Sequence, residues 1–212
     1  MIFPSEISGY PVTSINESFS FNNNQPIKSI VFNGPETIEN ESFVYLYDLE
    51  KLTFKENVKT IGMNMFSECP VLKEVILSDS VVEIESSAFS FCQELERVEL
   101  SDNLKSIGSN AFMSTHKIKG LEFPNSLETI GEYAFNSSGS TCAVFGKNIK
   151  EIGSTTVGFT GYSGCNYTDV RIPEFKVYGY VGTDAQRYAE ENGFEFIDIT
   201  DSKPEIVDEG FD

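Results

Sequence analysis

Residues 95–112 read Leu95-Glu-Arg-Val-Glu-Leu-Ser-Asp-Asn-Leu-Lys-Ser-Ile-Gly-Ser-Asn-Ala-Phe112, and variants of this stretch recur along most of the chain. The first part, Leu-x-x-Val-x-Leu, ends in the alternation of apolar and polar residues that is typical of a half-buried strand. The last part carries an isoleucine that is followed five residues later by a phenylalanine. This pair returns every 23 residues, at Ile38/Phe43, Ile61/Phe66, Ile84/Phe89, Ile107/Phe112 and Ile130/Phe135.

A constant period in this range is the signature of a solenoid, in which each repeat is one unit that cannot bury its own apolar side. We therefore expect a mostly β solenoid, in which parallel strands stack turn on turn and are joined by short turns and 3-10 segments. The glycine after the isoleucine is replaced by Glu39 and Glu85 in two repeats, which indicates a turn preference and no need for positive φ. One buried column should hold the structural residues Phe43, Phe66, Phe89, Phe112 and Phe135.

The repeat pattern loses its regularity at both ends of the chain. Ser20 stands at one phenylalanine position and Val157 at another. We expect about seven repeats over residues 1–182, of which the last are degenerate. A helix should follow, with Thr183 or Asp184 as N-cap and Asn192-Gly193 at its end, and then a strand over residues 194–197. This cap of residues 183–199 would cover the open apolar end, and residues 200–212 would form an acidic, disordered tail.

The chain is strongly acidic, with 33 acidic against 15 basic residues and a net charge of −18. Nucleic-acid binding needs clustered Lys and Arg against phosphates, and anionic lipid attracts basic segments, so both partners are disfavoured. No stretch approaches the ~20 apolar residues of a membrane helix, so we expect no direct membrane insertion. Met1 runs at once into repeat-like sequence without a signal peptide, so we expect a trimmed piece of a longer protein.

The four cysteines follow the repeat as well. Cys69 and Cys92 hold one repeat position in neighbouring turns. Adjacent turns lie about 5 Å apart, which leaves open both a disulfide and a column of free buried thiols. Cys142 and Cys165 share the 23-residue spacing and the same two alternatives. Because the sequence has no Cys-x-x-Cys and His116 is its only histidine, we expect no metal and no cofactor.

No catalytic set is recognisable in the sequence. A Ser-His-Asp group would have to use His116, and no serine lies in a Gly-x-Ser-x-Gly elbow. The glycine-rich residues 158–164 lack the lysine of a phosphate-binding loop. Paired carboxylates such as Glu190/Glu191 are too common in this chain to indicate an acid–base pair. We therefore expect no enzymatic activity.

The outward positions of the strands offer a candidate binding surface. One column reads Ser29, Lys51, Glu74, Arg97 and Gly120, and the next reads Val31, Thr53, Ile76, Glu99 and Glu122. Exposed apolar residues beside cations make the mixed patch that protein interfaces use, although β-branched residues also suit strands without any partner. The protein-binding candidates are Val31, Lys51, Thr53, Glu74, Ile76, Arg97, Glu99 and Glu122.

Residues 95–112 resemble the bacterial leucine-rich repeats of the BspA-like surface proteins, and so does the N-terminal Ile2-Phe-Pro-Ser-Glu-Ile. The closing segment Tyr178-Gly-Tyr-Val-Gly-Thr-Asp-Ala is similar to the segment that often ends such arrays. The resemblance implies a curved, right-handed leucine-rich-repeat solenoid with parallel strands on one side. It also implies an extracellular or cell-surface protein of a host-associated bacterium, usually assigned to adhesion or protein binding.

Three functions remain open at this stage. The first is a monomeric interaction module that binds host or neighbouring-cell proteins, such as extracellular-matrix or plasma proteins, through the strands. The second is a structural spacer that holds another domain away from an envelope. The third is glycan binding, which only the tyrosine-rich region supports, through Tyr162, Tyr167, Tyr178 and Tyr180.

Overall fold

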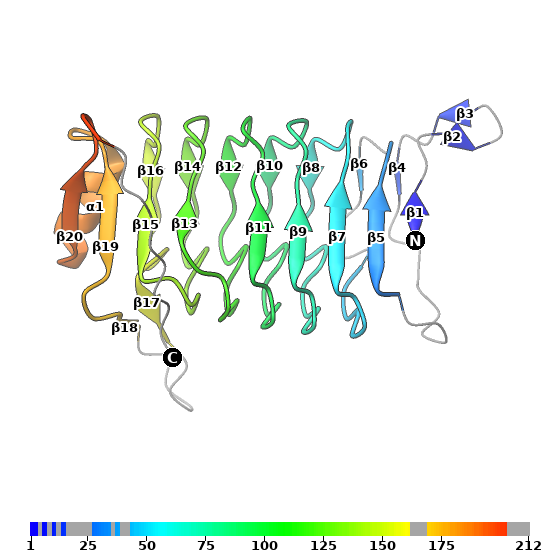
Figure 1. The fold of residues 1–212 in the computed structure, drawn as a ribbon, viewed down its shortest axis with the longest axis horizontal. Coiled ribbons are helices and arrows are strands. Elements are labelled where there is room, and N and C mark those ends of the chain that lie inside the picture. Colours follow the sequence, from blue (N-terminus) through cyan, green and yellow to red (C-terminus); the bar gives the residue numbers. More distant parts are fainter. Residues whose placement is uncertain are drawn as a thin grey trace.

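The computed structural model describes residues 1–3, 6–7, 10–11, 14–15, 27–34, 37–38, 43–161 and 169–202. The chain winds into a β-solenoid of about 7 turns with one short helix near its C-terminal end, which confirms the predicted fold class (Figure 1). Residues one repeat apart lie opposite each other in parallel strands, as Glu74 and Arg97 do. The 23-residue period is therefore the length of one turn.

One side of the solenoid carries the longer strands, which lie side by side along the molecule (Figure 1). In each four-residue strand of this side's first sheet the second and fourth residues are buried, so alternate side chains face the core and the solvent. That five-stranded sheet holds β1 (Ile2–Phe3), β5 (Ser29–Phe32), β7 (Lys51–Phe54), β9 (Glu74–Ile76) and β11 (Arg97–Glu99). A four-stranded sheet holds β13 (Leu121–Glu122), β15 (Cys142–Val144), β19 (Lys176–Gly179) and β20 (Glu195–Asp198).

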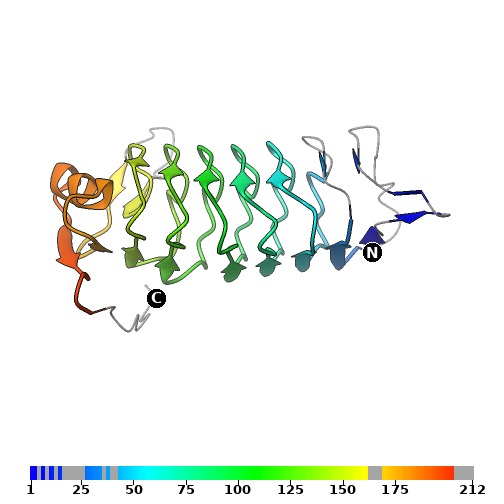
Figure 2. The same cartoon turned by 90° about the horizontal axis from the view of Figure 1, so that it is seen from above.

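A second row of short strands runs along the opposite side of the solenoid (Figure 2). Each strand ends on the isoleucine of its repeat, and that isoleucine is buried. The resemblance implied parallel strands on one side. The structure adds this second ladder, because the backbone of each turn needs hydrogen-bond partners here as well. The second row holds β8 (Thr60–Ile61), β10 (Glu83–Ile84), β12 (Ser106–Ile107), β14 (Thr129–Ile130) and β16 (Glu151–Ile152).

The remaining described elements lie near the two ends of the solenoid (Figure 1). They are the antiparallel pair β2 (Glu6–Ile7) and β3 (Tyr10–Pro11), the parallel pair β4 (Ser14–Ile15) and β6 (Thr37–Ile38), the antiparallel pair β17 (Phe159–Thr160) and β18 (Val170–Arg171), and the helix α1 (Asp184–Asn192).

A third ladder of hydrogen bonds runs through the segment around each phenylalanine, where no strand is formed. The N–H groups of Asn64, Phe66 and Glu68 donate to carbonyl oxygens of the next turn at 3.0, 2.8 and 2.9 Å. Asn64 and Glu68 are left-handed, with φ of 54° and 57°, and neighbouring turns repeat this at the same two positions. Because left-handed residues recur along this segment, the N–H groups of Asn64, Phe66 and Glu68 all point along the solenoid axis. These hydrogen bonds explain why residues other than glycine hold a conformation that L side chains disfavour.

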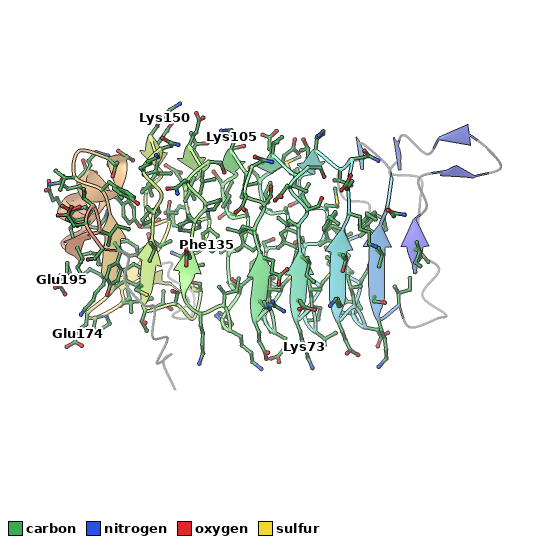
Figure 3. All side chains as sticks on the ribbon, turned by 45° about the horizontal axis from the view of Figure 1, so that its top comes forward. Lys73, Lys105, Phe135, Lys150, Glu174 and Glu195 are labelled. Atoms are coloured by element: carbon green, nitrogen blue, oxygen red, sulfur yellow. The ribbon has the colours of Figure 1, made fainter. Side chains whose placement is uncertain are left out.

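The phenylalanine column fills the interior between the three ladders. Neighbouring rings stack with centroid distances between 4.9 and 5.6 Å. Figure 3 shows Phe135 within the molecule, whereas Lys73 and Lys105 lie at its rim. Each ring pair contributes about 0.5–1.5 kcal/mol beyond the burial of its apolar area, so the column ties each turn to the next. The buried rings are Phe43, Phe66, Phe89, Phe112 and Phe135.

Glycines after the isoleucine lie at a close approach between turns, which the sequence did not reveal. A Cβ at Gly108 would lie 2.5 Å from the backbone nitrogen of Ser86, and a Cβ at Gly131 would lie 2.5 Å from that of Ser109. Neither glycine has a positive φ, in agreement with the sequence analysis. Glycine at this position therefore reflects how tightly one turn packs on the turn before it.

The helix α1 closes the second row of strands with side chains in place of a further strand. Asp184 Oδ2 accepts a hydrogen bond from the N–H of Ile152 at 2.6 Å, and Arg187 Nη2 donates to the carbonyl of Ile152 at 3.0 Å. The hydroxyl of Tyr188 accepts from the N–H of Val157 at 3.0 Å and donates to its carbonyl at 2.7 Å. Burial raises the pKa of Tyr188, which keeps the hydroxyl protonated and able to donate. These bonds satisfy backbone groups that would otherwise stay open at the edge of the ladder.

The bounds of α1 match the capping signals in the sequence. Thr183 is the N-cap residue, and Gly193 ends the helix in the left-handed conformation with φ of 68°. The predicted cap strand is β20, which pairs in parallel with β19. The predicted tail from residue 203 onward, and the irregular repeat position at Ser20, lie outside the described residues.

The cysteines that the structure describes are free thiols, namely Cys69, Cys92 and Cys142. The Cys92 thiol donates to the carbonyl of Phe66 in the preceding turn at 3.3 Å. Burial raises the pKa of the Cys92 thiol, so it stays protonated at neutral pH. Of the two alternatives for Cys69 and Cys92, the structure has the column of free buried thiols. Cys165 lies outside the described residues.

We predict that Phe89→Ala lowers the free energy of unfolding by about 3–5 kcal/mol, because it opens a cavity in the middle of the stacked column. Urea denaturation followed by circular dichroism measures this change. Phe91→Ala is the matched control, because Phe91 is only half-buried and lies outside the hydrophobic core. It should cost less than about 1 kcal/mol. Equal losses in the two variants would contradict the role of the column.

We predict that Tyr188→Phe lowers the free energy of unfolding by about 1–3 kcal/mol, because the N–H and carbonyl of Val157 lose their buried partner. The control is Tyr180→Phe, since the Tyr180 hydroxyl bonds to no residue that the structure describes, and it should be close to neutral. The same denaturation measurement compares the two variants. A neutral Tyr188→Phe would show that the hydroxyl does not close the ladder.

Candidate protein-interaction face

The outward columns of the long strands are formed in the structure. The pairing of β5, β7, β9 and β11 sets Lys51, Glu74 and Arg97 beside one another. The same pairing sets Thr53 beside Ile76 in the neighbouring column. Glu122 is exposed on β13, which belongs to the other sheet of this side. We call the eight predicted binding residues the strand face: Val31, Lys51, Thr53, Glu74, Ile76, Arg97, Glu99 and Glu122.

Lys51, Glu74, Arg97 and Glu99 of the strand face pair with one another. Glu74 lies between two cations and forms ion pairs with Lys51 and with Arg97, the latter at 2.9 Å. Arg97 forms a further ion pair with Glu99. The hydrogen bond from Lys51, with a smaller one from Arg97, lowers the pKa of the Glu74 carboxyl below its ordinary value. Two cations and two carboxylates leave this ladder with no net charge, in contrast to the net charge of −18 of the whole chain.

The aliphatic residues of the strand face are not fully exposed. Val31 and Ile76 are half-buried, and so is Thr53, which lies between them in the column. Below them, Ile30 and Leu52 point into the core and are completely buried. The result is a small apolar strip beside a charge-neutral ladder, whereas the sequence predicted exposed apolar residues beside cations.

The column that contains Ile76 and Glu122 continues along the later strands of this side. Register pairing carries it from Glu122 to Val144 on β15, Tyr178 on β19 and Ile197 on β20. Successive members are 22, 34 and 19 residues apart, so the 23-residue period does not reveal them. Val144 is itself buried, whereas Tyr178 is half-buried and alternates with the buried Val177. That alternation is the one signal in the sequence that could have placed Tyr178 on this face.

The remaining candidates from the sequence do not form a site. The ring nitrogen Nδ1 of His116 lies 2.9 Å from the carbonyl oxygen of Ser137, so the imidazole bonds to the backbone. Across the described ranges, no group of three His, Cys, Asp or Glu side chains could hold a metal ion. Tyr178 and Tyr180 are half-buried, and Tyr162 and Tyr167 lie outside the described residues. Nor does any described helix have the length and apolar character to cross a membrane.

Each turn consists of a strand, a polar corner, a second strand and a buried phenylalanine, and the turns stack at a constant period. This architecture defines a leucine-rich-repeat protein. More particularly, the chain belongs to the BspA-type family. The family model described as the BspA type leucine rich repeat region matches residues 36–165 in six copies. This range is more than half of the chain.

Two solved bacterial structures share the fold at low sequence identity. The leucine-rich repeat protein TpLRR of T. pallidum is 19% identical with a TM-score of 0.56, and the match covers 92% of this chain and 84% of that one. A leucine-rich cell surface protein of Faecalibacterium prausnitzii is 19% identical with a TM-score of 0.58, over 84% of this chain and 62% of that one. This chain therefore spans less than two thirds of the second protein. No match to a curated protein was found.

We predict that the pKa of Glu74 rises toward its ordinary value in Lys51→Ala, because the variant removes the hydrogen bond that holds the pKa down. Since the folded pKa is lowered, the stabilisation by ionised Glu74 is present at neutral pH and is lost as the pH falls through that pKa. Carbon-detected NMR titration of the carboxyl measures the change. Lys55→Ala is the control for removing one positive charge, since Lys55 forms no ion pair with a described residue. Equal shifts in both variants would contradict the local pairing.

Proposed function

We propose that the chain is a non-enzymatic protein-interaction module of a cell-surface or secreted protein. In this proposal it adheres to host or neighbouring-cell proteins, such as extracellular-matrix or plasma proteins, through the strand face. Leucine-rich repeats present long lateral surfaces rather than enclosed pockets, which favours binding over catalysis. A surface location is supported by the BspA-type family and by the F. prausnitzii neighbour, which is described as a cell surface protein.

The observation that carries the proposal is the charge-neutral ladder beside half-buried aliphatic side chains. On an acidic molecule most of the surface repels acidic partners, whereas a neutral patch with an apolar centre lets a partner approach and bury it. The ion pairs among Lys51, Glu74 and Arg97 also hold these long side chains in fixed positions, which lowers the conformational entropy that binding would cost.

The test is surface plasmon resonance of the purified chain against a panel of extracellular-matrix and plasma proteins. We expect at least one partner, and Val31→Gln combined with Ile76→Gln should weaken its binding about tenfold or more, because the apolar centre is lost. The matched control is Ser106→Gln with Thr129→Gln, which places the same side chains on half-buried outward positions of the second row of strands. Equal binding by the two folded variants would exclude the strand face as the binding surface.

A structural spacer is the second candidate function. The specific observation in its favour is that the charged column of the strand face already pairs within itself and needs no partner. If the folded chain binds no protein of the panel, the spacer becomes the better interpretation.

A further inference from the structure

A group of aromatic side chains stands at positions where the repeat favours none. Tyr45 and Phe91 hold the left-handed position two residues after the buried phenylalanine, with φ of 61° and 60°. Glu68 holds the same position in the turn between them, with φ of 57°. The corresponding residues further along are Ser114 and Ser137. A left-handed backbone is unfavourable for a bulky side chain, so local conformation does not account for two aromatic rings at this position.

Core packing does not account for these rings either. Tyr45 is 50% exposed and its neighbour Tyr47 is 60% exposed. Phe91 is half-buried and belongs to no part of the hydrophobic core, in contrast to Phe89 two residues earlier. Three aromatic rings on one surface, without a role in the backbone or the core, indicate a contact with another molecule.

The rings border a groove with a defined geometry. Tyr47, Glu68, Pro70, Phe91 and Gln93 line a groove of about 310 Å³. The ring centroids of Tyr45 and Tyr47 lie 6.4 Å apart, so Tyr45 extends the aromatic wall of the groove. Each residue at the Tyr45 position donates its N–H to the next turn, as Glu68 does to Ser90 at 2.9 Å, which fixes the spacing of the wall along the solenoid.

We propose that this groove, which we call the aromatic groove, binds a basic, proline-rich peptide segment in the polyproline II conformation. The buried rings of Phe43, Phe66 and Phe89 stack at 5.3 and 5.6 Å, so the rings of Tyr45 and Phe91, two residues further along and two turns apart, repeat at about 11 Å. A polyproline II helix advances ~3.1 Å per residue and about 9.3 Å per turn of three residues. Two residues of such a segment, three positions apart, therefore come close to the heights of the two rings along the groove.

The polar residues of the groove fit the same ligand. A polyproline II segment has no internal hydrogen bonds, so its carbonyl groups remain free to accept bonds from donors such as the Tyr47 hydroxyl and the Gln93 amide. The segment is also preformed, and aromatic-lined grooves bind such ligands with little loss of conformational entropy. The five lining residues therefore provide both the apolar walls and the donors that this class of peptide needs.

The charge of the groove selects a basic segment. Glu68 is exposed between the two aromatic positions, and no cation among the described residues lies within ion-pair distance of it. Glu74 and Glu99 of the strand face, in contrast, are paired with lysine or arginine. With a net charge of −18 on the whole chain, Glu68 attracts an arginine or lysine beside the prolines and repels acidic peptides.

The aromatic groove and the strand face lie on different ladders of the solenoid. The groove residues belong to the phenylalanine segments and their corners, whereas the strand face belongs to β5 to β13. The two proposals therefore fail independently. Loss of a partner in Val31→Gln with Ile76→Gln concerns the strand face, and loss of peptide binding in groove variants concerns the aromatic groove.

The test is fluorescence anisotropy of a fluorescein-labelled peptide of about 12 residues that repeats Arg-Pro-Pro, titrated with the whole chain at physiological salt. We expect saturable binding with a Kd in the micromolar range. Tyr47→Ala and Phe91→Ala should each weaken it about tenfold or more, and Glu68→Gln should weaken it and reduce its salt dependence. An Arg-Gly-Gly peptide of the same length and charge should bind at least tenfold more weakly, because it lacks the preformed conformation.

Tyr133→Ala is the matched control variant, since Tyr133 is another half-buried aromatic residue in a left-handed position and lies outside the groove. It should leave peptide binding unchanged, as should Val31→Gln with Ile76→Gln. Thermal unfolding by circular dichroism checks that each variant is folded, and the largely exposed Tyr47 keeps the test valid if Phe91→Ala is unstable. Four outcomes would overturn the proposal. They are no binding of the Arg-Pro-Pro peptide, equal binding of the Arg-Gly-Gly peptide, unaltered binding by folded Tyr47→Ala, and binding of a neutral oligosaccharide in the groove instead.

Discussion

The structure depends on one constraint, which is that each turn must donate its backbone hydrogen bonds to the turn beside it at a fixed spacing. Three separate ladders meet this requirement, at the long strands, at the short strands and around the phenylalanine. Because the turns are in register, a residue always lies beside its counterpart one repeat away. The stacked phenylalanines, the close approach at Gly108 and the ion pairs of Glu74 are consequences of that single geometry.

The same register converts the repeat into surfaces with distinct chemistry. A side chain repeated once per turn makes a continuous stripe, so small changes between repeats decide where a partner can bind. On the long strands, alternating charges at Lys51, Glu74 and Arg97 neutralise each other. Around the phenylalanines, Tyr45 and Phe91 depart from the small residues found later in the same column. These departures, rather than the repeat itself, distinguish this molecule's surfaces.

The sequence predicted what the period controls. The phenylalanine column, the outward columns of the strand face and the helix capped by Gly193 all follow from spacing and from capping residues. The left-handed residues around each phenylalanine could not be predicted from the sequence. Their φ values arise from hydrogen bonds between turns, and these bonds do not require a particular residue type. The extension through Val144, Tyr178 and Ile197 was missed because the spacing changes there. The aromatic groove was missed because its residues come from different repeat positions in three turns.

A regular ladder has no internal reason to stop, so its last strand needs partners of a different kind. For the row that ends at β16, these partners are the side chains of Asp184 and Arg187 on α1. The hydroxyl of Tyr188 forms the corresponding hydrogen bonds with the backbone of Val157. A partner that added a strand to this edge would have to displace α1 and break these bonds. Binding of another protein therefore costs less free energy along the sides of the solenoid than at this end. Both the strand face and the aromatic groove lie along the sides.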